Sequence, residues 1–318
     1  MRTLLCILML LTCTSHANEY SHQFAVEYQK KYGGDIEKIA AIIDKAEYKQ
    51  TIIDAITRPA EGKPWHEYQH IFISNKRVKA GLKFWKKHQA TLERAEKQFN
   101  VPQEIIVAII GVETYYGQLA GSWSPLDALY TLGFFYERRK DFFRSELEHL
   151  LKLVEEESLD LKNMKSSYAG AMGYGQFIPS SYRHYAIDFD GDGKRDLINN
   201  PVDAIGSVAN YFAEHGWKVG QPVMSPTIYT HKNPETIAEK GIKPHTAVKE
   251  LNQQGIHNII PIAPDNEASL IKYEYPDHNE YWMGFNNFYV ITRYNRSPLY
   301  ARSVYSLSIA LKQAYVAQ

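Results

Sequence analysis

The sequence predicts a mainly helical α+β protein that carries a small β-rich part before its C-terminal segment. From about residue 19 to 217, apolar residues recur at helical spacing between charged ones. From about residue 218 to 284, prolines and polar turns separate short apolar runs that are typical of strands. The last segment, ARSVYSLSIALKQAYVA, returns to helical periodicity. We therefore expect a helical core, a helical N-terminal part and a small β-rich insertion.

The composition is that of a globular protein without a charged binding surface. The chain has 318 residues, of which 44% are hydrophobic and 23% are charged. Its 36 lysines and arginines balance 36 aspartates and glutamates, which argues against nucleic acid or an anionic membrane as a partner. The 23 tyrosines and 5 tryptophans would suit carbohydrate rings, although tyrosine is equally common in cores and interfaces.

Residues 1–17 read as a secretory signal peptide. MRTLLCILMLLTCTSHA has one basic residue, an apolar run and small residues at a plausible cleavage site, and it is too short to span a membrane. Both cysteines, Cys6 and Cys13, lie inside it, so the mature chain would contain no disulfide. Lipidation of Cys13 is a less favoured alternative, because Thr12 is a poor residue before a lipidated cysteine.

Residues 18–99 form a predicted N-terminal helical domain. Within NKRVKAGLKFWKKHQATLERAEKQF, apolar residues recur every seven positions with charges between them, as in one amphipathic helix. The segment TRPAEGKPW, with two prolines and a glycine, separates this helix from earlier ones.

Residues 100–217 form the predicted core. Asn100 is a candidate N-cap, with Pro102 in the first turn of a helix over QEIIVAIIGVET. Helical signals continue through LDALYTLGFFYERRKDFFRSELEHLLKLVEEE, and NPVDAIGSVANYFAEHGW reads as a capped helix that ends at Gly216. Residues 218–284 are the predicted β-rich part, and residues 285–318 are expected to return to the core and end in the closing helix. WMGFNNFYVITRYN, which crosses this boundary, looks like a strand leading back to that helix.

The segment GAMGYGQFIPSS combines three glycines with large apolar side chains. Glycine allows positive φ or close backbone approach, whereas a flexible linker would lack methionine, tyrosine and phenylalanine. Such a segment can let a ligand lie against its backbone. It can equally be a tight connection whose side chains fill the core, and the residues alone leave both interpretations open.

Glu113 is the candidate catalytic residue. On a helix, Ile106, Ile109 and Ile110 share its face, so we expect the carboxylate to be buried. Burial raises the pKa of a carboxyl group and keeps it protonated near neutral pH, as in the general acid of a glycosidase. The alternative is a solvated glutamate in the last turn. No second carboxylate stands at an obvious partner position, which argues against a two-carboxylate hydrolase.

DFDGDGKRDLINN resembles the start of an EF-hand calcium loop. Asp188, Asp190 and Asp192 alternate, Gly193 is sixth, and the carbonyl of Lys194 is seventh. Position 12 is Asn199 instead of the usual glutamate. The alternative is a turn rich in aspartate and glycine that binds no metal.

Several blocks of the chain, taken together, resemble the lytic murein transglycosylase B family, whose members cleave the glycan strands of bacterial peptidoglycan. They occur in order over nearly all the mature chain: GVETYYG, LDALYTLGFFYERRKDFF, SYAGAMGYGQFIPSSYRHYAIDFDGDGKRDL, NPVDAIGSVANYFAEHGW and FYVITRYNRSPLYARSVY. The resemblance implies a lysozyme-like helical core, a periplasmic location and a monomer. It also implies peptidoglycan strands as the partner, with proteins of cell-wall synthesis or turnover as further candidates.

The resemblance assigns roles to individual residues. It implies that Glu113 protonates the oxygen between N-acetylmuramic acid and N-acetylglucosamine, then deprotonates the muramyl C6 hydroxyl, which closes a 1,6-anhydro ring without water. Phe142 departs from the tyrosine of the family pattern, which puts a hydrogen bond there in doubt. The implied substrate-binding residues are Ser167, Gln176, Phe177, Tyr211, Tyr294, Asn295, Tyr300, Arg138 and Arg139.

The resemblance also implies that Asp203 is the last metal ligand, reached through a lengthened loop over residues 188–203. Asp203 could alternatively cap the helix that Pro201 begins. We expect calcium as a structural ion and no cofactor for the chemistry. Two other functions remain open from the sequence: a muramidase that hydrolyses the same bond with water, and a non-catalytic module that binds peptidoglycan or senses calcium.

Overall fold

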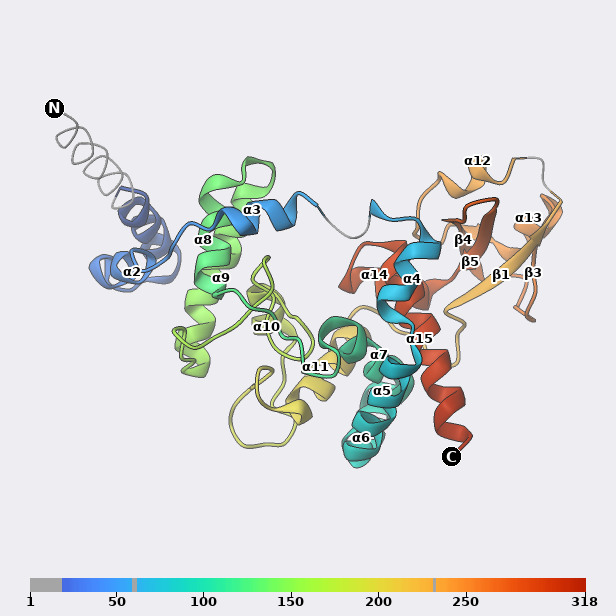
Figure 1. Ribbon diagram of the computed structural model, residues 1–318, viewed down its shortest axis with the longest axis horizontal. Helices are drawn as coiled ribbons and strands as arrows, with labels where there is room; N and C mark the ends of the chain where they lie inside the picture. The colour runs from blue at the N-terminus through green and yellow to red at the C-terminus, as the bar shows by residue number, and fades with distance from the viewer. Residues whose placement is uncertain (1–18, 59–61, 231–232) are drawn as a thin grey trace. The chain divides into compact units, whose positions relative to one another are not determined.

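The computed structural model describes residues 19–58, 62–230 and 233–318 (Figure 1). The predicted signal peptide over residues 1–17, with Cys6 and Cys13, lies outside the described residues. Within the described part of the chain, no helix combines the length and the apolar character needed to cross a membrane.

The chain forms two compact units. The first contains residues up to 57 together with 121–171 and 178–183, and the second contains 58–120, 172–177 and 184–318. Most of the described residues are helical and one small antiparallel sheet is present, so the mainly helical α+β class is confirmed. The predicted boundaries at residues 99, 217 and 284 stay predictions.

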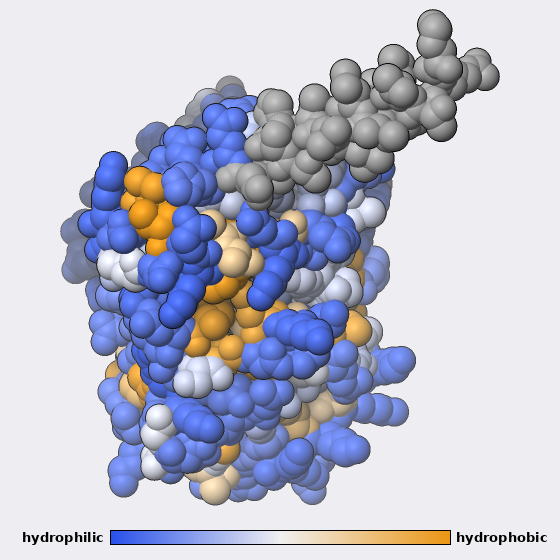
Figure 2. Space-filling model, turned by 90° about the vertical axis from the view of Figure 1, so that its left-hand side faces the viewer, coloured by the Kyte–Doolittle hydropathy of each residue, from blue (hydrophilic) through white to orange (hydrophobic). Residues whose placement is uncertain are grey.

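The first unit is helical, and α8 packs against α3 and α9. One expected helix is interrupted: the run that begins at Leu126 leaves helical geometry at Tyr136 and passes through a short 3-10 helix before α9. Figure 2 shows a face of the molecule on which hydrophilic residues surround a band of apolar ones. The elements are a helix over 19–32, α2 (Ile36–Ile43), α3 (Gln50–Ile56), α8 (Pro125–Phe135), the 3-10 helix (Glu137–Arg139), α9 (Lys140–Glu157) and α10 (Pro179–Tyr185), whose last residues belong to the second unit.

The helices of the second unit surround α7, which packs against α5, α6, α11 and α15. Because neighbours cover it on several sides, residues 105–112 of α7 are all buried. α11 begins at the expected cap, with the Asn200 side chain accepting from the N–H of Val202. The helices are α4 (Trp65–Phe72), α5 (Asn75–Lys87), α6 (Gln89–Phe99), α7 (Gln103–Thr114), α11 (Pro201–Glu214), α14 (Asn286–Tyr294) and α15 (Pro298–Val316).

Three local predictions were wrong. The expected single helix over residues 75–99 breaks at His88 into α5 and α6. Asn100 does not cap α7; it ends α6 in the left-handed conformation at φ 56°, which asparagine tolerates better than most residues. Residues 286–294 form α14 and not a strand, because Phe288 and Ile291 repeat at helical spacing on a buried face.

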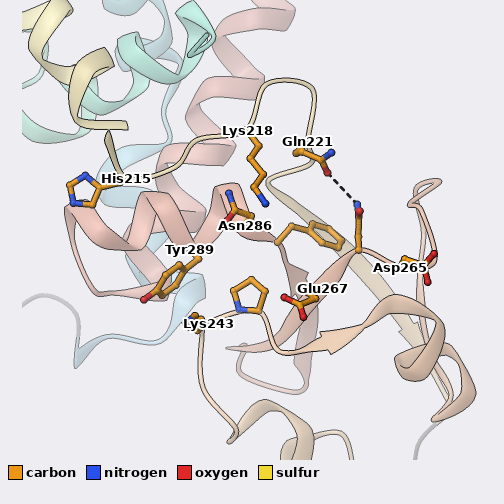
Figure 3. A pocket seen from close by; sticks show the side chains of 11 residues that line it. His215, Lys218, Gln221, Lys243, Asp265, Glu267, Asn286 and Tyr289 are labelled. Atoms are coloured by element: carbon orange, nitrogen blue, oxygen red, sulfur yellow. Dashed lines mark hydrogen bonds between the residues drawn. The ribbon is translucent and has the colours of Figure 1, made fainter. Parts of the chain in front are cut away.

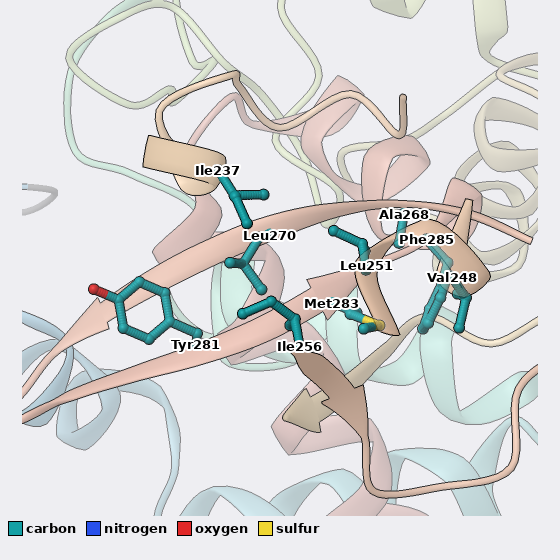
Figure 4. Packing of buried hydrophobic residues seen from close by; sticks show 9 residues of the cluster. All are labelled: Ile237, Val248, Leu251, Ile256, Ala268, Leu270, Tyr281, Met283 and Phe285. Carbon is teal, nitrogen blue, oxygen red and sulfur yellow. The ribbon is translucent and has the colours of Figure 1, made fainter. Parts of the chain in front are cut away.

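The β-rich part contains a five-stranded antiparallel sheet in the order β2-β4-β5-β1-β3. Its elements are β1 (Met224–Tyr229), α12 (Glu235–Ala238), β2 (Thr246–Ala247), α13 (Val248–Gln253), β3 (Ile256–Asn258), β4 (Glu267–Glu274) and β5 (Asn279–Gly284). One face packs on its own apolar cluster, in which Leu251 of α13 and Ile237 of α12 cover Leu270 and Met283 (Figure 4). The expected strands over PTIYT and SLIKYEY are thus confirmed as parts of β1 and β4. The expected strand over NIIPI was wrong, because β3 ends at Asn258, the first residue of that run.

A buried arginine ties α15 to α4 and the sheet. The guanidinium of Arg302 lies 4.3 Å from the ring centroids of Trp65, Tyr273 and Trp282, and the residue is 5% exposed. Its Nη2 donates to Glu280 at 2.7 Å. Burial opposes ionisation of Glu280, but hydrogen bonds from Trp282 and Arg302 outweigh it and lower the pKa of that carboxyl group.

We predict that Arg302→Ala destabilises the protein by about 2–3 kcal/mol, because it leaves a half-buried carboxylate unpaired and empties the space between three rings. Urea unfolding at neutral pH measures this. Lys312→Ala on the same helix is the control. The Lys312 side chain is 58% exposed, so its ion pair with Glu104 should contribute under about 1 kcal/mol to the free energy of unfolding. A loss for Arg302→Ala no larger than the control's would contradict the prediction.

The pair of Arg302 and Glu280 predicts how the stability of the protein changes with pH. Because the pKa of Glu280 is lowered on folding, its stabilisation is present above its unfolded pKa and is lost as pH falls through the folded pKa. Arg302→Ala should therefore lose less stability than the wild type on acidification.

Candidate active site and metal loop

Glu113 lies in the last turn of α7. The isoleucines expected on its face, Ile106, Ile109 and Ile110, are all 0% exposed, and Glu113 itself is half-buried. The carboxylate therefore sits at the edge of an apolar face, accessible at one side. This position suits a group that must exchange protons with a substrate while being partly shielded from water.

Tyr300, in the first turn of α15, holds this carboxylate. Its hydroxyl donates to Oε1 of Glu113 at 2.5 Å, although 187 residues separate the two in the chain. Tyr300 is 3% exposed, and burial, followed by the nearby charge of Glu113, raises its pKa well above the usual range. The phenol therefore keeps its proton and remains a hydrogen-bond donor at physiological pH.

Three further predicted residues form an aromatic cluster in the same unit. Ring centroids of Phe177 lie 5.7 Å from those of both Tyr211 and Tyr294, and the two tyrosines are 4.8 Å apart. Burial, followed by the charge of Glu113, raises the pKa of Tyr294 well above its usual range. Phe177 is 3% exposed and Tyr211 is 7% exposed, so both present little surface and mainly support their neighbours.

The glycine-rich segment is a tight connection in which glycine is required. Gly173 has φ +71°, and a Cβ atom there would lie 2.1 Å from the carbonyl oxygen of Leu197. The next residue, Tyr174, donates its N–H to that same carbonyl at 2.9 Å. The hydroxyl of Tyr294 donates to the carbonyl of Gly175 at 2.5 Å. The segment is thus fastened to residues distant in sequence, which a side chain at Gly173 would prevent.

Thr114, which the sequence analysis did not single out, fastens this segment to the end of α7. Its hydroxyl is fully buried, lies 2.9 Å from the carbonyl oxygen of Tyr174 and 3.1 Å from that of Ile110, and accepts from the N–H of Gly117 at 2.9 Å. A threonine after a helical glutamate carries no signal of such a role in the sequence, because its partners are backbone groups.

Gln176 and Asn295 are also engaged with the backbone. The amide nitrogen of Gln176 lies 3.1 Å from the carbonyl oxygen of Gly173 and 3.3 Å from that of Ala120. Asn295 follows α14, and its Oδ1 accepts from the N–H of Ser297 at 3.1 Å. The second unit therefore brings together Glu113, Tyr300, the aromatic cluster and residues 172–177 of the glycine-rich segment.

The remaining predicted substrate-binding residues belong to the first unit. The hydroxyl of Ser167 accepts from the N–H groups of Ala169 and Ala171, both at 3.2 Å. Arg138 and Arg139 lie on the 3-10 helix and are exposed, with the Arg139 guanidinium 4.1 Å from the ring centroid of Phe142. The binding roles of these residues stay predictions.

The predicted metal loop gathers carboxylates. Asp188, Asp190 and Asp203 each offer an oxygen within 4.8 Å of the others. Gly191 and Gly193 have φ +81° and +89°, so the turn glycine falls where the EF-hand pattern places it. Asp192 is not part of this group, and its Oδ1 accepts from the N–H of Lys194 instead.

Asp203 joins the loop from inside α11. Its side chain is fully buried and accepts from the N–H groups of Phe189 at 2.7 Å and Asp196 at 2.9 Å, while Asn200 provides the side-chain cap of the helix. Burial raises the pKa of Asp203, whereas N–H groups led by that of Gly193 lower the pKa of Asp188. The two loop carboxylates and the buried Asp203 of α11 form a donor set that suits a hard divalent cation.

Comparison with known proteins gives consistent matches over almost the whole chain. The model of the transglycosylase SLT domain matches residues 16–309. The membrane-bound lytic murein transglycosylase B of Escherichia coli K12 is 39% identical over 309 residues, which is 94% of this chain and 84% of that protein.

Solved structures agree. Lytic transglycosylase SltB1 of Pseudomonas aeruginosa, solved in a catenated form, is 46% identical with a TM-score of 0.87, covering 92% of this chain and 97% of the other. Lytic transglycosylase Slt35 of E. coli in complex with calcium is 40% identical with a TM-score of 0.85, covering 93% of each chain. SltB3 of P. aeruginosa in complex with NAG-anhNAM-pentapeptide is 28% identical with a TM-score of 0.81, covering 93% of this chain and 79% of that one. The chain therefore belongs to the transglycosylase SLT family of lytic transglycosylases.

Proposed function

We propose that this protein cleaves the β-1,4 bond between N-acetylmuramic acid and N-acetylglucosamine in peptidoglycan and leaves a 1,6-anhydro ring, with Glu113 as the single acid and base. The observation that carries the proposal is the half-buried Glu113 held by the buried donor Tyr300. Lytic transglycosylases at 39–46% identity support the reaction class.

The proposed reaction needs one carboxyl group used twice. Protonated Glu113 gives its proton to the bridging oxygen as the bond between that oxygen and C1 of the muramyl residue breaks. The resulting carboxylate then takes the proton of the C6 hydroxyl, whose oxygen bonds to C1 and closes the ring. The proton returns to Glu113, no water is consumed, and the substrate's N-acetyl group could assist at C1.

Tyr300 orients the group that does this work. By donating to Oε1, it fixes the plane of the carboxylate and stabilises its charged form, which is the state that must accept the C6 proton. The raised pKa of Tyr300 keeps the phenol itself out of the proton transfer.

The glycan would bind beside this pair. SltB3, a relative at 28% identity, is described with NAG-anhNAM-pentapeptide, which supports a peptidoglycan fragment as ligand. In this proposal the sugar contacts the backbone of the glycine-rich segment. It also contacts the side chains of Gln176, Tyr294 and Asn295. Phe177 and Tyr211 support them. Ser167, Arg138 and Arg139 of the first unit stay proposed substrate-binding residues by family resemblance.

Two other functions remain distinguishable. A muramidase would cleave the same bond with water, and a non-catalytic module would only bind murein or sense calcium. Mass spectrometry of digested murein separates the three: anhydro ends, reducing ends heavier by one water, or no cleavage.

We also propose that the protein acts in the periplasm as a monomer. The predicted signal peptide supports export, and the name of the E. coli relative describes that protein as membrane-bound, which keeps lipidation of Cys13 as the alternative. Metabolic labelling with a fatty acid, compared between the wild type and Cys13→Ala, decides between them.

We further propose that calcium binds the loop over residues 188–203 as a structural ion. Asp188, Asp190 and Asp203 would supply carboxylate oxygens. The EF-hand pattern adds the side chain of Asp192 and the carbonyl of Lys194 at its fifth and seventh positions. A relative's complex with calcium supports the choice of ion. The ion would balance the charges of these neighbouring carboxylates and take no part in bond cleavage.

We predict that Glu113→Gln lowers turnover by at least about 10²–10⁴-fold while folding and glycan binding persist, because an amide cannot donate and then accept a proton. Release of anhydro-muropeptides measures turnover, and the unfolding midpoint checks the fold. Glu104→Gln in the first turn of the same helix is the matched control. Substantial turnover by folded Glu113→Gln would remove the assignment.

We predict that Tyr300→Phe lowers kcat by about 10-fold and moves the pH–rate limb of Glu113 to higher pH, because the ionised carboxylate loses a donor. The pH dependence of kcat on one muropeptide substrate measures both effects. Tyr305→Phe, in the same helix α15, is the control. A Tyr300→Phe profile that superimposes on the wild type would show that the hydrogen bond does not tune the reaction.

We predict that millimolar calcium raises the melting temperature, since an ion that binds only the folded state stabilises it by RT ln(1 + [L]/Kd). Asp203→Asn should abolish this rise, while Asp160→Asn, outside the loop, should preserve it. Metal-free enzyme at low temperature should keep most of its activity. Activity lost on chelation from a protein that stays folded would place the metal in the mechanism.

A further inference from the structure

A concave site apart from Glu113 lies in the β-rich part of the second unit. A cavity of about 410 Å³ opens between the loop after α11, the segment before β2, the start of β4 and the first turns of α14 (Figure 3). None of the residues assigned to glycan binding lines it. Its floor includes Phe285, which is 2% exposed, and polar or charged side chains surround that floor.

Charges of both signs converge on this cavity without neutralising one another. Lys218 and Lys243 enter from two separate segments, and Glu267 enters from the start of β4 (Figure 3). Within the described part of the chain, none of these three side chains has an ion-pair partner. Asp265, at the rim, differs because it pairs with Lys249 at 2.7 Å. Two ammonium groups and one carboxylate are thus available to a ligand.

The loop that carries Lys218 is built into the fold by a buried side chain. Asn287 is fully buried; its Oδ1 accepts from the N–H of Lys218 at 2.8 Å, and its Nδ2 donates to the carbonyls of Lys218 and Gln221 at 2.8 and 3.0 Å. Asn286, which lines the cavity, donates to the carbonyl of Gly216 at 2.9 Å. These bonds hold the loop in one conformation, so ligand binding costs little conformational entropy for ordering the loop.

The cavity is also connected to the aromatic cluster. His215 lines it and stacks on Tyr211, with ring centroids 4.0 Å apart and planes 21° from parallel. Tyr211 in turn packs on Tyr294, whose hydroxyl binds the glycine-rich segment. His215 therefore links the lining of the cavity to the aromatic cluster of the candidate site.

We propose that this cavity binds the peptide of a muropeptide, with peptide carboxylates at Lys218 and Lys243 and a peptide amino group at Glu267. The inference rests on the proposed function for the identity of the ligand. A peptide matches the lining because it carries both charge signs, and its backbone amides can meet the side-chain amides of Asn286 and Gln221. A purely anionic or purely apolar ligand would leave one set of charges without a partner.

The test measures binding in the Glu113→Gln background, so that no turnover is needed. The probes are NAG-anhNAM-pentapeptide, the same disaccharide without peptide, and the free pentapeptide, titrated by calorimetry and by NMR of the Asn286 side-chain amide. The double variant Lys218→Ala/Lys243→Ala removes two cation contacts, and Glu267→Gln removes the anion contact without changing shape. Lys86→Ala on the exposed face of α5 is the control for loss of a surface lysine.

We expect the double variant to weaken binding of the peptide-bearing disaccharide by about 10-fold and Glu267→Gln by about 3-fold, with the peptide-free disaccharide and Lys86→Ala unchanged. The free pentapeptide should shift the Asn286 amide resonance. Equal affinity for both disaccharides, or equal weakening of both, would overturn the proposal. Murein digestion by the wild type tests the proposed function separately, because cleavage without anhydro ends would refute that function while leaving the peptide-dependent difference intact.

Discussion

The hydroxyl of Thr114 joins the end of α7, which carries Glu113, to the glycine-rich segment, and the geometry of the candidate site depends on that junction. It sits one residue after Glu113, is fully buried, and lies 2.9 Å from the carbonyl oxygen of Tyr174. The hydroxyl oxygen of Thr114 also accepts from the N–H of Gly117, so the chain turns immediately after α7 instead of continuing outward. These hydrogen bonds fix the Glu113 carboxylate relative to the glycine-rich backbone that we propose binds the glycan.

Around this junction, three buried or half-buried tyrosines act through their hydroxyl groups. Tyr300 donates to Glu113, Tyr294 donates to Gly175, and Tyr211 donates to the carbonyl of Arg293 at 2.7 Å. Burial raises the pKa of each, so all three remain donors. The richness in tyrosine therefore has two uses here: apolar faces that fill the interior and protonated hydroxyls that fix polar partners. Composition alone could not separate these uses from direct contact with sugar.

Buried side chains also fix the backbone in the β-rich part. Asn287 holds the loop at the mouth of the proposed peptide cavity, and His215 stacks on Tyr211 between that cavity and the aromatic cluster. Arg302, between three rings, ties the sheet to α15, the helix that carries Tyr300. The sheet therefore helps to position the residue that orients Glu113, in addition to the ligand role we propose for it.

The sequence by itself determined the elements whose signal is local: the buried face of α7 with Glu113 at its end, the capped helix α11, the short strands and the aspartate–glycine turn. It failed at Asn100, His88 and residues 286–294, where single residues or tertiary burial overrode a regular pattern. Only the tertiary structure decided the pairing of Tyr300 with Glu113 across 187 residues, the junction at Thr114 and the cage around Arg302. These contacts join side chains to partners far along the chain, often to backbone groups that are identical in every residue, so no spacing in the sequence records them.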